Sequence, residues 1–355
     1  MSLIPATILT GFLGAGKTTL LKRILTEAHG QKIAVIENEF GEENIDSDIL
    51  VSDTSEQIIQ MSNGCICCTI REDLRVTLQD LAEKKRKGEL SFDRVVIETT
   101  GLADPGPVAQ TFFMDDEIAE SYLLDSILTL VDAKHAPTQL NDRQEARRQV
   151  GFADQIFISK SELVSKDALE ALQHRLKHMN PRAPQQTVHF GEVAMKDVFD
   201  LRGFNLNAKL DIDPDFLKVD DHAHHHHAEG EACDHPSHSP SRDHTHDHSH
   251  GHHHHTDDDV KSFVFKSDRP FDPAKLEDFL GAIVNIYGPR MLRYKGVLYM
   301  QGTDRKVIFQ GVHQLMGSDL GPAWGPEEHK SSKMVFIGID LPKDILLQGM
   351  EQALV

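Results

Sequence analysis

Short apolar runs alternate with longer mixed segments along the first half of the chain. The runs are three to six residues long, the length of buried strands in a parallel sheet. Residues 20–25, 72–87 and 167–179 have the polar and apolar spacing of helices. This alternation predicts an α/β fold with a mostly parallel sheet and helices on both faces. The predicted strands are residues 4–9, 32–36, 94–97, 126–131, 155–158 and 186–188.

A second pattern begins at residue 260, where apolar and polar positions alternate as in a strand with one buried face. A helix, three strands and a closing helix follow this first strand. The resulting order βαβββα predicts a smaller C-terminal α+β domain. The predicted helices are residues 273–287 and 343–354, and the further strands are 293–300, 306–312 and 334–339.

Residues 220–259 separate these two parts and contain almost no apolar side chains. Such a segment cannot bury a core, so we expect it to be disordered. The sequence therefore divides into a first domain at residues 1–219, a linker at 220–259 and a C-terminal domain at 260–355.

Composition narrows the classes of function. The 355 residues are 39% apolar and carry a net charge of -19, which argues against a nucleic-acid partner. No apolar run approaches the roughly 20 residues that span a bilayer, and the N-terminus lacks the pattern of a secretory signal. We therefore expect a cytoplasmic protein without a membrane partner, as a monomer or weak homo-oligomer.

Nine consecutive residues after the first predicted strand form a phosphate-binding loop of the type Gly-x4-Gly-Lys-Thr. The loop precedes a predicted helix, and this strand–loop–helix context makes the match specific. Its backbone N–H groups would bind phosphates, with Lys17 reaching the β- and γ-phosphates and the Thr18 hydroxyl binding Mg²⁺. The nucleotide-contacting residues are predicted to be Gly11, Phe12, Leu13, Gly14, Ala15, Gly16, Lys17, Thr18 and Thr19.

Glu98 ends another predicted core strand and is followed by Thr-Thr-Gly. A carboxylate at this place corresponds to the Walker B position, which holds Mg²⁺ through water. Gly101 would offer its backbone N–H to the γ-phosphate. An exposed acid at a strand end, without a role, is the alternative.

Three of the four cysteines, Cys65, Cys67 and Cys68, follow an Asn-Gly turn signal. Thiolates at this spacing can bind Zn²⁺, although three ligands leave a tetrahedral site open. A fourth ligand could be Glu37 or Glu42 from the acidic stretch after the second strand, a water, or a partner protein. Alternatively, the thiols are buried as small apolar side chains, and the acidic stretch merely faces solvent.

Fifteen of the 22 histidines lie in residues 222–255. Neutral imidazoles bind Zn²⁺, Ni²⁺ and Co²⁺, so this segment predicts many weak, exchangeable metal sites near the cysteines. An affinity tag and a linker with no metal role are the alternatives.

Four motifs together resemble those of the CobW-type family of metallochaperone GTPases. They are the phosphate-binding loop, Glu-Asn-Glu-Phe-Gly-Glu at residues 37–42, Cys-Ile-Cys-Cys at 65–68 and Glu-Thr-Thr-Gly-Leu-Ala-Asp-Pro at 98–105. The resemblance covers nearly the whole chain and is closest to the YjiA-like zinc-binding branch. It implies that GTP is hydrolysed to GDP and that zinc, or alternatively cobalt or nickel, passes from the Cys-x-Cys-Cys site to a client apo-metalloprotein. It also places Ser159, Lys160 and Glu162 on the guanine-recognition motif, where aspartate is usual in place of Glu162.

Two other functions use the same features. A metal-buffering protein with regulatory GTP binding would bind metal regardless of the nucleotide. A kinase would need a pocket for the phosphate acceptor, for which the sequence gives no sign. The leading hypothesis is a GTP-dependent metallochaperone in which Lys17, Thr18, Glu98 and Gly101 carry hydrolysis.

Overall fold

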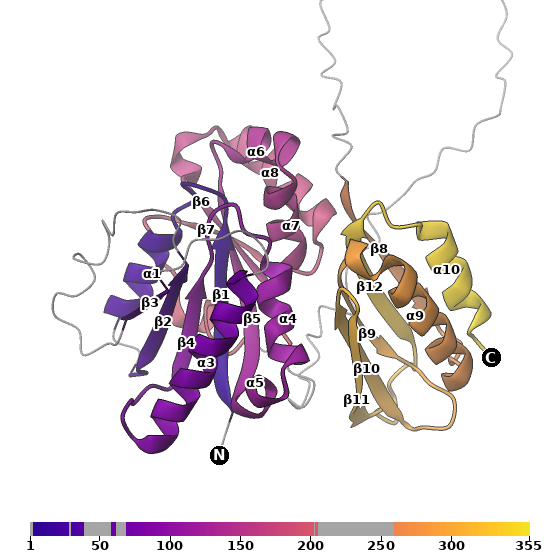
Figure 1. The fold of residues 1–355 in the computed structure, drawn as a ribbon. Coiled ribbons are helices and arrows are strands. Elements are labelled where there is room, and N and C mark those ends of the chain that lie inside the picture. Colours follow the sequence, from indigo (N-terminus) through magenta and orange to yellow (C-terminus); the bar gives the residue numbers. More distant parts are fainter. Residues whose placement is uncertain (1–2, 28–29, 39–57, 62–68, 202, 205–258) are drawn as a thin grey trace, which may run out of the picture. The chain divides into compact units, whose positions relative to one another are not determined.

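A computed structural model describes residues 3–27, 30–38, 58–61, 69–201, 203–204 and 259–355 (Figure 1). These residues form one parallel and one antiparallel β-sheet. The histidine-rich residues 222–255 lie outside them, as do Cys65, Cys67, Cys68 and Glu42. No helix within the described ranges is both long and apolar enough to cross a bilayer.

The first sheet has seven described strands in the order β3-β2-β4-β1-β5-β6-β7, and every neighbouring pair is parallel. The prediction of a parallel sheet is therefore confirmed. Strand β3 was not expected, and it forms one edge of the sheet. The strands are β1 (Ile4–Gly11), β2 (Ile33–Asn38), β3 (Ile58–Met61), β4 (Arg94–Glu98), β5 (Tyr122–Asp132), β6 (Gln155–Ser159) and β7 (Gln185–Val188).

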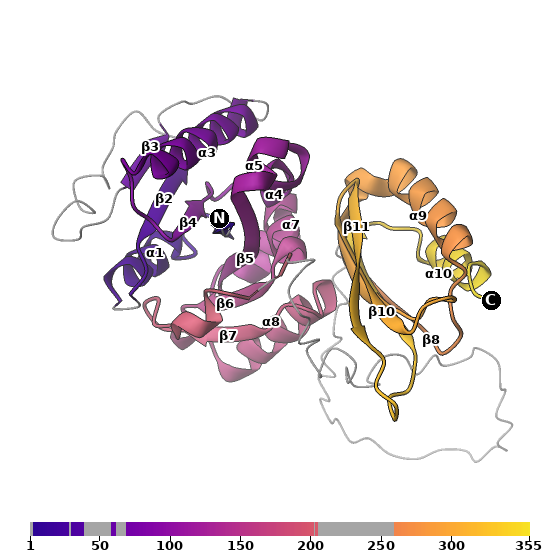
Figure 2. The same cartoon turned by 90° about the horizontal axis from the view of Figure 1, so that it is seen from below.

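Helices cover both faces of this sheet. Helix α1 lies on one face, where its leucine and isoleucine side chains form a core with Val193, Val198 and Phe199. Helices α3, α4 and α7 lie on the other face (Figure 2). The helices are α1 (Lys17–Thr26), α3 (Thr69–Lys87), α4 (Pro105–Met114), α5 (Asp116–Ser121), α6 (Ala136–Asp142), α7 (Gln144–Phe152) and α8 (Lys166–Met179), and two short 3₁₀ helices are Ser161–Leu163 and Met195–Asp197.

Helix starts follow from local capping. Asp104 caps α4 by accepting a hydrogen bond from the N–H of Gly106, and Pro105 occupies the first helical position. Asp272 caps α9 in the same way. Such caps satisfy N–H groups that have no partner inside the helix. Four helices between β4 and β6 were not predicted, because they are short and their apolar faces are brief.

The second sheet has the order β11-β10-β9-β12-β8 and is antiparallel throughout. Two helices pack on one face and enclose an aromatic and aliphatic core that includes Tyr294 and Phe336. The predicted α+β domain is confirmed. Its elements are β8 (Val260–Ser267), α9 (Pro273–Tyr287), a 3₁₀ turn (Gly288–Arg290), β9 (Met291–Leu298), β10 (Arg305–Val312), β11 (Leu315–Ala323), β12 (Ser332–Ile339) and α10 (Lys343–Gln352).

Strand β11 is the one described strand of this domain that the predicted βαβββα order lacks. Its sequence, Leu-Met-Gly-Ser-Asp-Leu-Gly-Pro-Ala, contains two glycines and a proline, which have low strand propensity. The strand lies at the edge of the sheet and pairs only with β10 there. A proline is tolerated at an edge because one side of the strand needs no hydrogen-bond partner.

Candidate functional site

The phosphate-binding loop joins β1 to α1. Gly16, at the N-cap of α1, has a φ angle of 99°, which glycine adopts without steric cost. A Cβ atom at Gly11 would lie 2.5 Å from the carbonyl oxygen of Leu130 on β5. Glycine therefore lets the loop leave β1 close beside β5 and curl over the N-terminus of α1, where N–H groups and the helix dipole favour phosphate.

Lys17 begins α1, and its side chain is buried under the loop. Its Nζ donates to the carbonyl oxygen of Gly11 at 2.9 Å and to that of Phe12 at 3.4 Å. Burial lowers the pKa of the Lys17 ammonium group, and the charge of Glu98 offsets part of this shift. A bound phosphate would favour the charged form further.

Thr18 and Glu98 meet directly below the loop. The Thr18 hydroxyl donates to Oε1 of Glu98 at 3.2 Å, so the two predicted Mg²⁺ groups come together. Glu37 is the register partner of Glu98 on the adjacent strand β2, and its side chain is buried. Hydroxyl and carboxylate oxygens are ligands that suit Mg²⁺. The chemistry of this donor set therefore fits a magnesium ion held by Thr18, with Glu98 acting through water.

The loop that follows β4 packs on the phosphate-binding loop. A Cβ atom at Gly101 would lie 2.7 Å from the backbone nitrogen of Leu13. This close approach requires glycine and brings the backbone of Gly101 beside the loop that binds phosphates. The predicted contact between the Gly101 N–H and the γ-phosphate is compatible with this arrangement.

The predicted base-recognition residues follow β6 and also touch the phosphate-binding loop. The Ser159 hydroxyl donates to the carbonyl oxygen of Ala15 at 2.7 Å, and Lys160 Nζ donates to that of Gly14 at 2.8 Å. Glu162 is exposed, with one carboxylate oxygen 3.5 Å from Nδ1 of His189. The carboxylate is therefore at the surface, two residues beyond Lys160, where it could accept hydrogen bonds from a base.

Asp132, at the end of β5, fixes Lys160 from the other side. Its Oδ2 accepts hydrogen bonds from Lys160 Nζ at 2.6 Å and pairs with Nδ1 of His135 at 2.9 Å. Its Oδ1 accepts backbone N–H groups of Lys134 and His135. Burial by itself would raise the pKa of the Asp132 carboxyl, but these hydrogen bonds outweigh burial and hold the pKa below its ordinary value. The carboxylate is thus charged and anchors the lysine.

A family model described as "CobW/HypB/UreG, nucleotide-binding domain" matches residues 5–187, and one described as "Cobalamin synthesis protein cobW C-terminal domain" matches residues 260–354. The chain belongs to the CobW/HypB/UreG family. The zinc chaperone YjiA of Escherichia coli K12 is 39% identical over 345 residues, covering 97% of this chain and 96% of that protein.

A solved structure of YjiA and one further relative are also similar to the chain. The crystal structure of the Zn(II)-bound YjiA GTPase from E. coli has a TM-score of 0.74 and 35% identity, and the match covers 99% of both chains. The zinc-regulated GTPase metalloprotein activator 1 of Schizosaccharomyces pombe is 36% identical over 208 residues, which are 57% of this chain and 50% of that protein.

The predicted metal ligands of this CobW/HypB/UreG protein fall mostly outside the described residues. Cys65, Cys67, Cys68 and Glu42 are not among them, whereas Glu37 is a buried residue of β2. Within the described ranges, no three His, Cys, Asp or Glu side chains are grouped as a metal site would require. The zinc site therefore remains a prediction.

Two residues of the site were not predicted, namely Asp132 and Gln149. Asp132 had a signal in the sequence, since it ends a predicted strand just as Glu98 does. Gln149 had none. It lies within α7, and its amide donates to the backbone of the loop after β4, more than 40 residues away in sequence. Only the packing of α7 against the sheet brings this side chain to the site.

Proposed function

We propose that the chain is a GTP-dependent metallochaperone, which hydrolyses GTP to GDP and phosphate and passes zinc to client apo-metalloproteins. Lys17 binds the β- and γ-phosphates, Thr18 binds Mg²⁺, and Glu98 orients the magnesium-bound water. Gly101 donates its N–H to the γ-phosphate. Ser159, Lys160 and Glu162 recognise guanine, with Lys160 anchored by Gly14 and Asp132.

One observation supports this function most directly, the register of Glu37 against Glu98 on adjacent strands. Glu37 is a proposed zinc ligand, and Glu98 is the proposed Mg²⁺ group that the Thr18 hydroxyl contacts. Strand β3 pairs with β2 on its other side, and Cys65 follows the end of β3 by four residues in the sequence. A change at the γ-phosphate would thus act one strand away from a metal ligand.

Coupling between the two sites follows from this arrangement. Loops that contact Mg²⁺ or the γ-phosphate are ordered by a triphosphate and released on hydrolysis. If zinc binds through Glu37 or Glu42 together with Cys65, Cys67 and Cys68, and the nucleotide state moves these residues, then zinc affinity changes with the nucleotide. By linkage, zinc then changes nucleotide affinity by the same factor. Cobalt and nickel suit the same ligands less specifically and remain alternatives for the cargo.

The zinc chaperone YjiA and the fission-yeast metalloprotein activator provide the biological precedent. We infer that this chain serves a client metalloprotein, and that residues 222–255 raise the local concentration of metal ions. We place it in the cytoplasm, as a monomer or weak homo-oligomer.

Metal buffering with regulatory GTP binding is the second candidate, and the 15 histidines of residues 222–255 favour it. A buffer should lose most of its zinc capacity when these residues are deleted. A chaperone should keep one tight site and its GTPase activity, since those belong to the domain that precedes the segment.

The proposal is tested on the chain lacking residues 222–255. Its zinc affinity is measured by competition with a chromogenic chelator, first with GDP bound and then with a non-hydrolysable GTP analogue and Mg²⁺. We expect zinc affinity to shift about tenfold, roughly 1.4 kcal/mol of coupling. The shift should vanish in Cys67→Ala and persist in a full-length control, Cys233→Ala, whose cysteine lies in the histidine-rich segment. Equal zinc affinities in both nucleotide states would leave a GTPase whose two sites do not communicate.

A further inference from the structure

Helix α7 (Gln144–Phe152) carries a polar side chain that lies inside the domain. Gln149 is 1% exposed, whereas Gln144 at the start of the helix is exposed and Arg147 and Arg148 are partly buried. Burying an amide group without hydrogen-bond partners lowers the free energy of unfolding by up to several kcal/mol. A glutamine is therefore expected here only where both ends of its amide, or at least its N–H groups, have defined acceptors.

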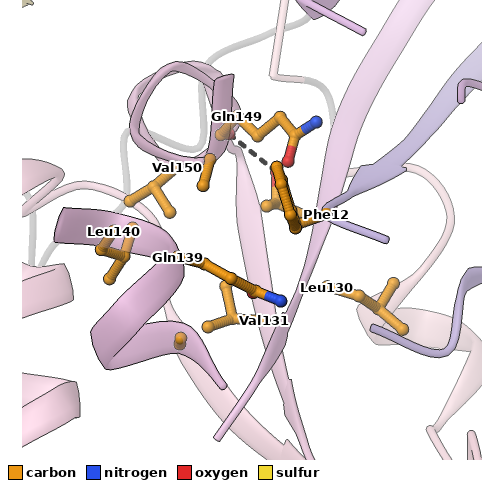
Figure 3. Close-up of a pocket in the computed structure, with 10 residues that line it drawn as sticks. Phe12, Leu130, Val131, Gln139, Leu140, Gln149 and Val150 are labelled. Atoms are coloured by element: carbon orange, nitrogen blue, oxygen red, sulfur yellow. Dashed lines mark hydrogen bonds between the residues drawn. The ribbon is translucent and has the colours of Figure 1, made fainter. Parts of the chain in front are cut away.

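The amide nitrogen of Gln149 has two acceptors in one loop. Its Nε2 donates to the carbonyl oxygen of Gly101 at 3.1 Å and to that of Ala103 at 3.0 Å. Only an NH₂ group can donate to two carbonyl oxygens, which assigns the orientation of the amide. The backbone oxygen of Gln149 accepts from the Thr129 hydroxyl at 3.0 Å (dashed line in Figure 3), which fixes the helix to β5.

The preceding residue of α7 holds the far end of the same loop. Arg148 pairs with Oδ2 of Asp104 at 2.5 Å, while Oδ1 of Asp104 caps α4. Consecutive side chains of α7 thus bind residues 101, 103 and 104. The path of the loop between β4 and α4 is set by this helix.

The loop that Gln149 holds also lies against the phosphate-binding loop. Gly101 approaches Leu13 so closely that a Cβ atom would overlap its backbone nitrogen. Phe12 lines a cavity of about 10 Å³ together with Gln149 (Figure 3). This volume is no more than one water needs, so the cavity is a packing gap and not a ligand site. Gln149 therefore lies between the two loops with little room to move.

We propose that Gln149 is the positioning residue that holds the backbone of Gly101 for contact with the γ-phosphate. This inference rests on the proposed function, because it requires a triphosphate on the phosphate-binding loop. Without the amide donors, the buried carbonyl oxygen of Gly101 and the partly buried one of Ala103 lose their partner, and the loop turns to satisfy them elsewhere. The N–H of Gly101 then leaves the γ-phosphate, whereas contacts to the α- and β-phosphates remain.

The first test replaces Gln149 by methionine, which keeps the length of the side chain and removes both donors. The affinities of fluorescent GDP and of a fluorescent non-hydrolysable GTP analogue are measured on the full chain, together with single-turnover hydrolysis. We expect GDP affinity within about twofold of the unmodified protein, and analogue affinity or the hydrolysis rate lowered at least about tenfold. Equal losses for both nucleotides, or no loss for either, would overturn the inference.

Gln139→Met is the matched control, because Gln139 lines the same cavity from α6, across from Gln149 (Figure 3). It should leave both affinities and hydrolysis unchanged. Thermal unfolding with GDP shows whether each variant is folded. An unmodified chain that does not hydrolyse GTP would defeat the proposed function, while the comparison of GDP with the analogue would still test Gln149.

Gln149→Glu supplies a second test that does not depend on the methionine variant. A buried glutamate facing two carbonyl oxygens has a raised pKa, because both burial and the oxygen dipoles disfavour its charge. When protonated it can donate one of the two hydrogen bonds. We expect its affinity for the GTP analogue to rise relative to that of the unmodified chain as the pH falls from about 8 to about 6. The same pH profile in both proteins would contradict a positioning role.

Discussion

The hydroxyl of Thr18 donates a hydrogen bond to the carboxylate of Glu98, 80 residues later in the chain. The contact joins the first turn of α1 to the end of β4, which are adjacent because β1 and β4 pair in parallel. The two groups that we propose to hold Mg²⁺ are therefore adjacent. The same carboxylate counteracts the effect of burial on the pKa of Lys17.

Glu98→Gln should lower kcat for GTP hydrolysis at least about tenfold, with a smaller change in GDP affinity. The glutamine oxygen can still accept from Thr18, but the charge that orients the magnesium water is lost. Steady-state hydrolysis at several Mg²⁺ concentrations measures the effect. Glu120→Gln removes the same charge from an exposed position of α5 and should behave like the unmodified chain. Unchanged hydrolysis in Glu98→Gln would contradict the role of Glu98.

Gly101→Ala should slow hydrolysis at least about tenfold, because the added methyl group must push the loop away from Leu13. Gly281→Ala is its control. Gly281 lies in α9 with nothing within 4 Å of the added carbon, so alanine should stabilise that helix by up to about 1 kcal/mol. Hydrolysis assays and thermal unfolding separate the two effects. A fully active Gly101→Ala would show that the loop does not need this approach.

Asp132→Asn should weaken GTP and GDP binding alike, by about tenfold. An asparagine cannot accept from Lys160, His135 and two backbone N–H groups at once, so Lys160 loses its anchor. Asp142→Asn, an exposed change of the same charge on α6, is the control. Nucleotide titration by fluorescence measures both. Loss of binding for only one of the two nucleotides would point to a different role for Asp132.

The Asp132 carboxylate should make the free energy of unfolding depend on pH in the acidic range. Its pKa is lowered in the folded chain, so the folded state binds fewer protons than the unfolded state around the ordinary pKa of an aspartate. Stability from this group is complete above that pKa and is lost as the pH falls through the folded value. Urea unfolding from about pH 5 to about pH 3 should therefore show a smaller pH-dependent loss in Asp132→Asn than in the unmodified chain. Parallel curves would refute this contribution.

Glu162→Ala should reduce the preference for GTP over ATP by at least about tenfold, because the carboxylate no longer accepts from guanine. Glu162→Asp should keep the preference, since aspartate is the usual residue at this place in the motif. Glu170→Ala, an exposed position of α8, is the control. Competition of GTP and ATP for one fluorescent nucleotide gives the ratio. If Glu162→Ala keeps the ratio, another group recognises the base.

Local spacing was enough to predict where the phosphate-binding loop and Glu98 lie in the fold. The pattern Gly-x4-Gly-Lys-Thr works only with a strand before it and a helix after it, and each of these has its own apolar periodicity. Glu98 could be singled out because it is the first charged residue after the buried apolar residues 95–97. The conformation of the loop and the position of Glu98 depend on residues that are close in the sequence, so the sequence is enough to predict them.

The sequence by itself determined the parallel sheet, the phosphate-binding loop, the predicted base motif and the smaller α+β domain. Only the tertiary structure decided that Gln149 holds Gly101 and that Asp132 holds Lys160, because these pairs meet through packing across 48 and 28 residues of chain. The edge strand β11 was decided in the same way. Its glycines and proline disfavour a strand locally, and pairing with β10 supplies the hydrogen bonds that overcome this preference.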